Sequence, residues 1–296
     1  MNLFPARTRR SFLKTTALAT GASALSQARV AGANEKIRIA MIGVGWKGGG
    51  LLKVFGGMND VSIVALCDPD AERMREGAAQ LEKLGKPKAA QEKDFRKVLE
   101  RRDIDAVVLA TPNHWHALQT IWACQAGKDV YVEKPHAHTI WEGRKMIEAA
   151  RKYRRIVQVG LQTRSDTGMK SAARWIQEGH LGAIKSIKAF WFRSREPIGK
   201  RTTPLAPPAS LDYDLWLGPA EDKPIYRDEL HYDWHWDWNS GNGEMGNIGT
   251  HVADVARCFL GDPAPARRVM SFGNRFSWDD AGTTPNVHCA HFDFKV

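Results

Sequence analysis

The sequence is poor in cysteine, and its cysteines are not spaced as a metal or disulfide motif requires. The 296 residues include four cysteines and no C-x-x-C pair. Without such pairs, neither a disulfide framework nor a zinc site is expected. All four stand in apolar stretches, so we predict that they are core residues: Cys67, Cys124, Cys258 and Cys289.

Long apolar runs and basic clusters are also missing. No run approaches the roughly 20 apolar residues of a membrane-spanning helix, so no membrane span is predicted. The formal net charge of +10 includes five basic residues and no acidic residue in the first 33, which leaves +5 for the rest. Beyond those residues no Lys/Arg cluster is interleaved with aromatic residues, so nucleic acid is not an expected partner.

The N-terminus contains an export signal. Arg9 and Arg10 stand within T-R-R-S-F-L-K, and a mildly apolar stretch follows, ending in an A-x-A site at residues 31–33. This order predicts a twin-arginine signal peptide over residues 1–33 and a periplasmic or otherwise exported protein. Because that route carries folded proteins, we expect a cofactor to be loaded before export and retained.

A glycine-rich turn follows the first predicted strand, residues 36–43. The turn reads G-x-G-x-x-G and precedes a helical stretch at 51–55; it contains Gly43, Gly45, Trp46 and Gly48. Glycines let a pyrophosphate approach the backbone, and N–H groups at the start of the helix bind it. The turn therefore predicts a dinucleotide site.

The second predicted strand, residues 61–67, ends in Asp68. A carboxylate there accepts hydrogen bonds from both ribose hydroxyls and repels a 2′-phosphate, which favours NAD over NADP. The alternative is that residues 68–70 form only a turn and a helix cap.

Strands and helices alternate as far as residue 160. The alternation predicts an α/β fold whose N-terminal domain, residues 34–160, is a doubly wound parallel Rossmann sheet. The remaining helices are expected at 71–84, 95–100, 114–126 and 140–153, and the remaining strands at 105–110, 129–132 and 156–160.

Two of these strands end in polar residues. Strand 105–110 is followed by Thr111, Asn113 and His116, and strand 129–132 is followed by Glu133 and Lys134. The carboxyl ends of parallel strands are where ligands bind in an open sheet, so we expect these side chains beside the cofactor. The alternative for Glu133 and Lys134 is an exposed ion pair at a strand end.

The glycine turn, A-T-P-N (110–113) and V-E-K-P (132–135) together resemble the Gfo/Idh/MocA family (glucose–fructose oxidoreductase and inositol dehydrogenase), over nearly all of residues 36–296. The resemblance implies that Lys134 lies beside the nicotinamide and the reacting hydroxyl, and Glu133 near the cofactor's ribose. It also implies homo-oligomers and a C-terminal α+β domain, residues 161–296, with a large, mainly antiparallel sheet. Gln162 and Arg164 would line its cleft, although Arg164 has the alternative of a solvated loop charge.

Within that second domain a helix is expected at 170–178 and strands at 184–193, 266–275 and 287–294. The chain stops inside the last strand, so we expect a fragment or a natural truncation with an incomplete sheet.

Residues 231–239 alternate between polar and aromatic side chains, as an extended chain with two faces would. The aromatic face, which includes Trp236, could stack on a sugar or pack in the core. The polar face is rich in His and Asp, but ligands from one strand rarely suffice, so we predict no metal and favour a polar cleft lining.

Four glycines between residues 241 and 249 favour close approach of the backbone to a ligand. A helix is predicted at 246–259, with Asn247, His251 and Asp254 on one face. The resemblance assigns His251 as the acid/base, and Asn247 stands where family dehydrogenases commonly carry Asp. The alternative is a core histidine satisfied by Asp254.

These residues favour an NAD-dependent oxidoreductase acting on a secondary alcohol or ketone of a sugar or cyclitol, with a tightly bound cofactor. His251 would take the hydroxyl proton, Lys134 would stabilise the oxygen anion and Asn247 would hold the substrate. Two alternatives stay open: a redox-neutral NAD-dependent glycosidase, and a non-catalytic cofactor- or sugar-binding protein.

Overall fold

The computed structural model describes residues 36–295. The expected signal peptide, residues 1–33, lies outside the described residues. Within residues 36–295, no helix is long and apolar enough to cross a membrane.

The N-terminal half is built on a six-stranded sheet in which every neighbouring pair is parallel. The strand order is β3-β2-β1-β4-β5-β6, so it reverses between β1 and β4. In a doubly wound fold the ligand crevice lies outside the carboxyl ends of the strands at this reversal. The strands are β1 (Ile37–Ile42), β2 (Val61–Cys67), β3 (Ala90–Glu92), β4 (Ala106–Leu109), β5 (Asp129–Glu133) and β6 (Val157–Gly160).

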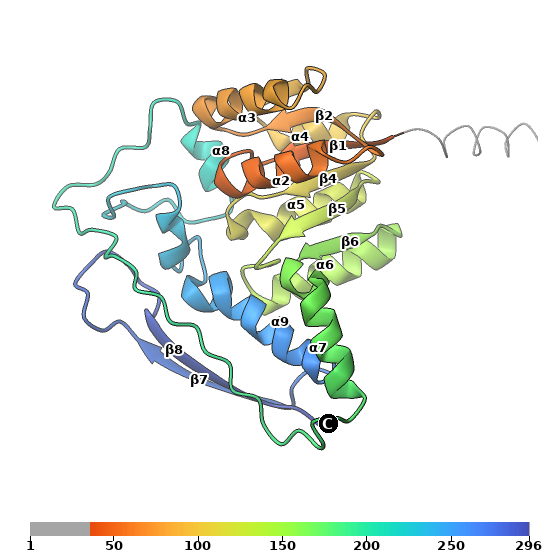
Figure 1. The fold of residues 1–296 in the computed structure, drawn as a ribbon. Helices are drawn as coiled ribbons and strands as arrows, with labels where there is room; N and C mark the ends of the chain where they lie inside the picture. Colours follow the sequence, from red (N-terminus) through yellow and green to blue (C-terminus); the bar gives the residue numbers. More distant parts are fainter. Residues whose placement is uncertain (1–35, 296) are drawn as a thin grey trace, which may run out of the picture.

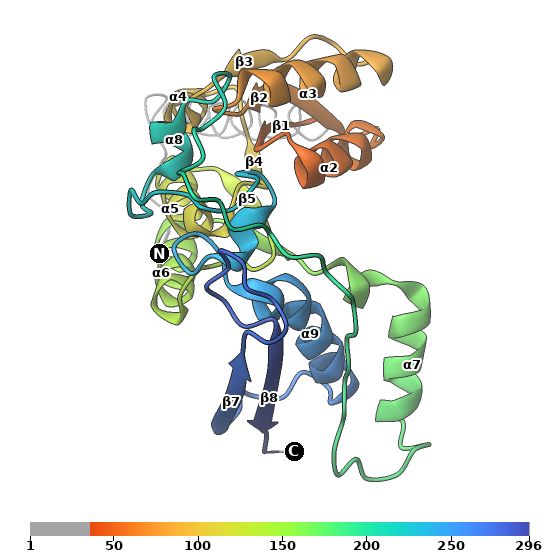
Figure 2. The same ribbon diagram turned by 90° about the vertical axis from the view of Figure 1, so that its left-hand side faces the viewer.

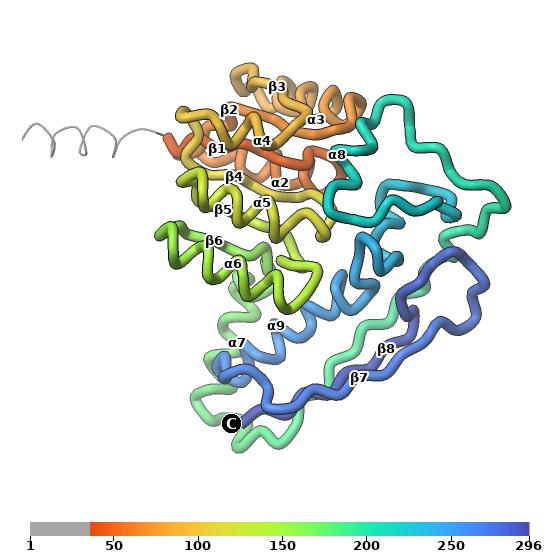
Figure 3. Tube along the Cα trace, turned by 180° about the vertical axis from the view of Figure 1, so that it is seen from behind, coloured from red at the N-terminus to blue at the C-terminus, as the bar shows by residue number. Residues whose placement is uncertain are grey.

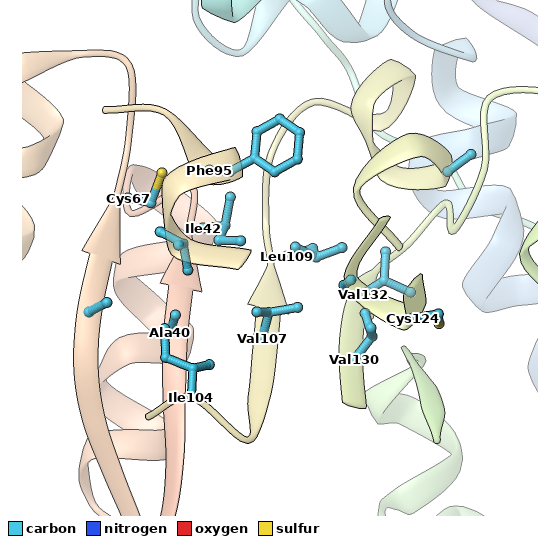
Figure 4. Packing of buried hydrophobic residues seen from close by; sticks show 14 of the residues in the cluster. Ala40, Ile42, Cys67, Phe95, Ile104, Val107, Leu109, Cys124, Val130 and Val132 are labelled. Carbon is cyan, nitrogen blue, oxygen red and sulfur yellow. The ribbon is translucent and has the colours of Figure 1, made fainter. Parts of the chain in front are cut away.

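Helices cover both faces of this sheet (Figure 1). They are α2 (Trp46–Gly56), α3 (Ala71–Lys83), α4 (Phe95–Glu100), α5 (Asn113–Gln125) and α6 (Ile140–Tyr153). Successive side chains of a strand point to opposite faces, so each strand contributes side chains to two hydrophobic cores, one on each face of the sheet. In β1, Ala40 and Ile42 belong to a cluster with residues of α4, α5 and α6, and Figure 4 shows them in the same cluster as Phe95 of α4 and Cys124 of α5. Ile39 and Met41 belong to a second cluster with residues of α2 and α3.

The Rossmann prediction is confirmed, with one element missed. Each predicted helix and strand of this half has an observed counterpart, although α2 begins earlier, at Trp46. β3 was not predicted because it has only three residues, A-Q-E, with no apolar pattern. It forms through pairing with Ala65 to Cys67 of β2 at the sheet edge.

The second half packs below this sheet in Figure 1 and contains a small antiparallel sheet. Its elements are η2 (Gln162–Ser165), α7 (Thr167–Gln177), α8 (Tyr213–Leu217), η3 (Asp233–Trp236), the π-helix η4 (Met245–Gly249), α9 (Thr250–Phe259), β7 (Arg268–Asn274) and β8 (Val287–Asp293). α7 and α9 lie side by side in Figure 2, tied by a 2.8 Å hydrogen bond from Gln177 Nε2 to the Cys258 carbonyl.

The segment around α8 returns to the Rossmann domain, as Figure 3 shows. The Ala71 N–H donates to the Ser210 carbonyl at 2.9 Å, and the Asp212 N–H donates to the Pro69 carbonyl at 3.0 Å. His231 Nε2 lies 2.9 Å from the Asp70 carboxylate, which is the N-cap of α3. These contacts fix the second half against the carboxyl end of β2.

Several expectations for the second half are wrong. Residues 184–193 form no strand, so the antiparallel sheet within residues 36–295 is small rather than large. It consists of β7 and β8, which match the strands expected at 266–275 and 287–294. Phe190, Trp191 and Phe192 are exposed, and within residues 36–295 no strand pairs with this segment, although its residue types favour strands. Cys289 is exposed in β8 and Cys258 only half-buried, so just two of the four cysteines are core residues.

Residues 231–239 are not extended either. The N–H of His235 donates to the Tyr232 carbonyl at 3.2 Å, and that of Ser240 to the Asp237 carbonyl at 3.1 Å. Such i to i+3 bonds coil the chain into η3. The coil removes the expected two-faced pattern. It buries Trp236, which is 7% exposed, so this residue follows the core-packing alternative, and its contact with a substrate stays a prediction.

Candidate active site

The glycine turn between β1 and α2 has the geometry that a dinucleotide needs. Gly43 has φ +82°, and a Cβ at Gly48 would lie 1.9 Å from the Gly43 carbonyl oxygen, so only glycine allows the helix to sit this close to the strand. Gly45 precedes α2, and no side chain caps the first N–H groups of that helix. The open N–H groups fit a pyrophosphate. Trp46, the first residue of α2, is 83% exposed beside them.

Asp68 lies at the end of β2 and faces this turn. Its Oδ2 accepts from the Val44 N–H at 2.9 Å and its Oδ1 from the Asp70 N–H at 3.0 Å. Burial raises the pKa of Asp68, and the two backbone N–H groups oppose that rise. A carboxylate has about four acceptor positions, so ribose hydroxyls can still be bound. The turn and helix cap considered for residues 68–70 are present, since Asp68 accepts from the Asp70 N–H and Asp70 caps α3, and the ribose-binding role of Asp68 stays a prediction.

The polar residues after β4 are more deeply buried than expected. Asn113 and His116 are each 1% exposed. The two ring nitrogens of His116 lie 2.7 Å from the Pro135 carbonyl and 2.8 Å from the Thr111 carbonyl. Burial lowers the pKa of His116 to about 4, so the ring is neutral at physiological pH. His116 therefore ties the ends of β4 and β5 together rather than lining the crevice, and half-buried Thr111 donates to Gln119 Oε1.

Glu133, the last residue of β5, is 3% exposed and paired. Lys47 Nζ of α2 lies 3.2 Å from its Oε1, and the Lys134 N–H donates to its Oε2 at 3.2 Å. Lys47 belongs to the glycine motif but was not singled out from the sequence. The pair joins the glycine turn to the tip of β5, so the simple exposed ion pair considered for Glu133 and Lys134 is wrong.

Lys134 and Asn247 meet, although 113 residues separate them. Lys134 Nζ donates a 2.7 Å hydrogen bond to Asn247 Oδ1. Burial lowers the pKa of Lys134, Glu133 opposes this, and Lys47 lowers it further. The ammonium is therefore held at the strand tip by an uncharged partner from the second half of the chain.

His251 follows on the same helical segment, four residues after Asn247. Its Nδ1 is buried and has no hydrogen-bond partner within residues 36–295. Burial lowers the pKa of His251, and the charge of Lys134 lowers it further. Asp254 does not satisfy this histidine, because its carboxylate accepts two bonds from Arg164 Nε, at 2.8 and 3.0 Å, and one from Nη2 at 2.7 Å. The alternative of a core histidine satisfied by Asp254 is therefore wrong.

Arg164 and Asp254 are bound to each other, as are Arg164 and Asp262 at 2.9 Å. They join η2 to α9, and exposed Gln162 begins the same η2 turn. The ion pairs account for the arrangement of Arg164, Asp254 and Asp262 without a substrate. The assignments of all these side chains to substrate or cofactor stay predictions.

The glycines at 241–249 lie close to other parts of the protein. A Cβ at Gly246 would lie 2.5 Å from the Asn242 Cβ and 3.4 Å from Pro135 Cγ, and one at Gly241 would lie 2.4 Å from the His235 carbonyl oxygen. Gly246 therefore lets η4 come close to Pro135, just beyond β5, and approach of these glycines to a ligand stays a prediction.

One polar cluster beside Lys134 was not predicted. The Arg195 guanidinium forms two 2.8 Å bonds with the Glu244 carboxylate and donates to the Tyr232 hydroxyl oxygen at 3.0 Å. Its carbon lies 4.7 Å from the centre of the Trp236 ring. Trp236 thus supports Arg195. A sequence signal existed only for Glu244, which stands three residues before Asn247.

The fold and this site define a dinucleotide-binding Rossmann domain followed by an α/β domain that reaches back over it. A family model described as an oxidoreductase family with an NAD-binding Rossmann fold matches residues 37–161, and the C-terminal alpha/beta domain of the same family matches residues 184–281. The chain belongs to the Gfo/Idh/MocA family, and its Rossmann domain is the NAD-binding domain of that family.

Two curated relatives illustrate the likeness. A glycosyl hydrolase family 109 protein of Bacteroides thetaiotaomicron is 39% identical over 166 residues, which are 55% of this chain and 36% of the relative. The levoglucosan dehydrogenase of Pseudarthrobacter phenanthrenivorans is 29% identical over 178 residues, 60% of this chain and 38% of the relative. The matched part is thus little more than a third of each relative's length.

Solved structures share the fold at low identity. The WlbA dehydrogenase from Bordetella pertussis, in complex with NADH and UDP-GlcNAcA, has a TM-score of 0.63 at 20% identity, covering 88% of this chain and 66% of that one. An oxidoreductase domain protein from Kribbella flavida has a TM-score of 0.64 at 24% identity, covering 88% and 64%.

Proposed function

We propose that this protein transfers hydride between NAD and a secondary alcohol or ketone of a sugar or cyclitol. The observation that carries the proposal is the 2.7 Å contact of Lys134 Nζ with Asn247 Oδ1. It brings a strand-tip lysine and the helix of His251 to the same edge of an NAD-binding sheet. The levoglucosan dehydrogenase relative supports a sugar as substrate.

Each side chain has a role that its surroundings favour. The nicotinamide ring, when bound, accepts or returns the hydride. His251 is neutral at pH 7 because burial and Lys134 lower its pKa, so it is ready to take a hydroxyl proton. The Lys134 ammonium stabilises the negative charge that develops on the substrate oxygen. The Asn247 amide orients Lys134 and binds a substrate hydroxyl, but it takes no proton.

A second candidate function is a redox-neutral glycosidase, in which hydride is removed from the sugar and later returned to it. The family 109 glycosyl hydrolase relative supports this candidate. Asn247, in place of a carboxylate, weakens the case for a plain dehydrogenase without selecting the glycosidase. A non-catalytic cofactor- or sugar-binding protein is the third candidate, and the presence of both Lys134 and His251 near one strand tip counts against it.

The deciding experiment starts from purified protein with its natural cofactor content. Denaturation and chromatography identify the released dinucleotide, for which we expect NAD. Nicotinamide absorbance is then followed while a panel of sugars is added, with Lys134→Met and His251→Gln as inactive controls. An absorbance change that both variants lose supports hydride transfer. Release of an aryl group from aryl glycosides without net formation of NADH assigns the glycosidase. A protein that binds NAD but neither transfers hydride nor cleaves a glycoside overturns both enzyme functions.

Export and assembly belong to the same proposal. The twin-arginine motif at Arg9 and Arg10 supports export of the folded, NAD-loaded protein, and the family resemblance supports a homo-oligomer. Fractionation of bacteria that express the Arg9→Lys, Arg10→Lys double variant tests the first point, because the variant should stay in the cytoplasm. Light scattering tests the second, and a monomer would overturn it.

A further inference from the structure

We propose that Arg195 and Glu244 determine substrate specificity, and that with Tyr232 they bind adjacent ring hydroxyls of a neutral sugar. The proposal rests on the hydride transfer proposed at Lys134. The three side chains come from separate segments: Arg195 follows the unpaired stretch 184–193, Tyr232 precedes η3 and Glu244 precedes η4.

The Arg195 guanidinium is fixed in orientation. Glu244 holds its Nε–Nη2 edge with two 2.8 Å bonds, the Tyr232 hydroxyl accepts a third bond from Nη1 at 3.0 Å, and the guanidinium carbon lies 4.7 Å from the centre of the Trp236 ring. A guanidinium has five N–H donors. One N–H on each terminal nitrogen thus has no partner within residues 36–295, and the Tyr232 hydroxyl still has its own proton to donate.

This group faces the site rather than a remote surface. The Tyr232 ring lies 4.7 Å, edge to face, from the ring of Trp46 at the glycine turn. Glu244 and Arg195 both act on the charge of Lys134, the former raising its pKa and the latter lowering it. Glu244 is also three residues from Asn247, which Lys134 contacts directly. The cluster therefore lies between the glycine turn and the reacting end of the site.

The pairing selects for neutral ligands. A bidentate carboxylate already balances the Arg195 charge, so little attraction for an anion is left. What remains is a set of fixed donors beside carboxylate acceptors, and a pair of neighbouring hydroxyls offers the matching donors and acceptors. A uronate in the same position would meet the negative charge of Glu244, a repulsive element that excludes it.

The test compares Glu244→Gln and Arg195→Lys with matched controls in the same stretch, Glu196→Gln and Arg193→Lys, both of which change exposed side chains. The substrates are neutral pyranoses and their uronates, such as glucose with glucuronate and galactose with galacturonate. We expect Glu244→Gln to raise the uronate-to-neutral ratio of kcat/KM at least tenfold. Arg195→Lys keeps the positive charge but loses the planar guanidinium that donates paired hydrogen bonds. KM for the neutral sugar should therefore rise roughly 10- to 100-fold, with a smaller change in kcat.

Unchanged ratios in folded, NAD-loaded Glu244→Gln protein would overturn the proposal. Failure of hydride transfer itself is distinguishable, because sugar binding is also measured by tryptophan fluorescence without turnover. Suppose that no sugar changes the nicotinamide absorbance, but neutral sugars bind and Glu244→Gln shifts the binding preference toward uronates. The role of Arg195 and Glu244 in specificity is then supported, and the proposed hydride transfer is overturned. If the variants fold, retain NAD and bind both sugar classes as the parent does, the pair has no such role.

Discussion

The ammonium of Lys134, at the tip of β5, donates a 2.7 Å hydrogen bond to the side-chain oxygen of Asn247 in η4. This bond joins the two halves of the chain at the reacting edge of the sheet. Because the acceptor is an amide, the contact orients Lys134 without neutralising it. His251, one helical turn later, therefore lies in the field of a positive charge that lowers its pKa.

Replacing Asn247 by Asp should change the pH dependence of catalysis. Burial and Lys134 hold the pKa of His251 below its ordinary value of 6.5, so kcat/KM for oxidation should fall only below that pH. A carboxylate at 247 favours protonated His251, and we expect the acidic limb of the profile to move up by about one pH unit. The check is a kcat/KM profile from pH 4 to 8.

The control is Asn59→Asp in the exposed turn after α2, which should leave the profile unchanged. An acidic limb that stays in place in Asn247→Asp would mean that a group other than His251 takes the proton.

Buried neutral histidines should make the protein sensitive to acid. Burial lowers the pKa to about 4 for His114 and His116 and to about 3 for His235. The unfolded chain binds protons near pH 6.5, before the folded chain does, so the free energy of unfolding should fall as the pH drops from about 6.5 toward 4 and stay constant above that window. Urea unfolding at a series of pH values measures this.

The slope of the free energy of unfolding against pH reflects how many more protons the unfolded chain binds. His114→Gln should lower that number by about one, whereas His180→Gln, at an exposed site, should not alter it. Since most carboxylates titrate near pH 4, the interval from pH 6.5 to 5 separates the histidine effect from theirs. A stability that is flat across this interval would contradict the burial of the three neutral rings.

Sequence reasoning succeeded where the signal was local. The glycine turn and the strand tips each combine a pattern with an immediate structural consequence, whereas the roles of Asp68, Lys134 and His251 stay predictions. It failed where a partner far along the chain decides the structure. Residues 184–193 have strand-forming side chains but no neighbouring strand within residues 36–295. β3 has no strand-forming pattern, but it has β2 as a neighbouring strand.

The same limit applied to the site. Arg195 and Glu244 are 49 residues apart, and nothing in either local sequence reports the other. Residues 231–239 have a period of two, but a left-handed Tyr232, φ 68°, and i to i+3 hydrogen bonds coil them instead. Three of the polar side chains there bond to residues outside the coil: His231 to Asp70, Asp237 to Arg227 and Asn239 to Glu221.

Three alanine substitutions in one turn and helix should have three different results. At Gly48 a Cβ would lie 1.9 Å from a carbonyl oxygen, so Gly48→Ala should destabilise the Rossmann domain by several kcal/mol, roughly the range of severe overpacking. At Gly45 the nearest atom would be 3.4 Å away, so Gly45→Ala should fold but lose dinucleotide affinity through its methyl group. Gly50→Ala meets nothing within 4 Å and should be stabilising by about 1 kcal/mol.

Urea unfolding and NADH titration separate these results. Equal NADH affinity in Gly45→Ala and Gly50→Ala would show that the pyrophosphate does not approach the turn at Gly45.

Asp68→Asn should weaken the preference for NAD. The amide oxygen still accepts one of the N–H groups of Val44 and Asp70, so the turn should fold. The lost negative charge removes both the strong acceptor for ribose hydroxyls and the repulsion of a 2′-phosphate. We expect the NADH dissociation constant to rise about tenfold and that of NADPH to rise less or fall. Fluorescence titration with both nucleotides measures the ratio, and Asp60→Asn, on the exposed turn before β2, is the control. If Asp68→Asn left the ratio where it was, discrimination between the two nucleotides would have to come from residues other than the carboxylate at the end of β2.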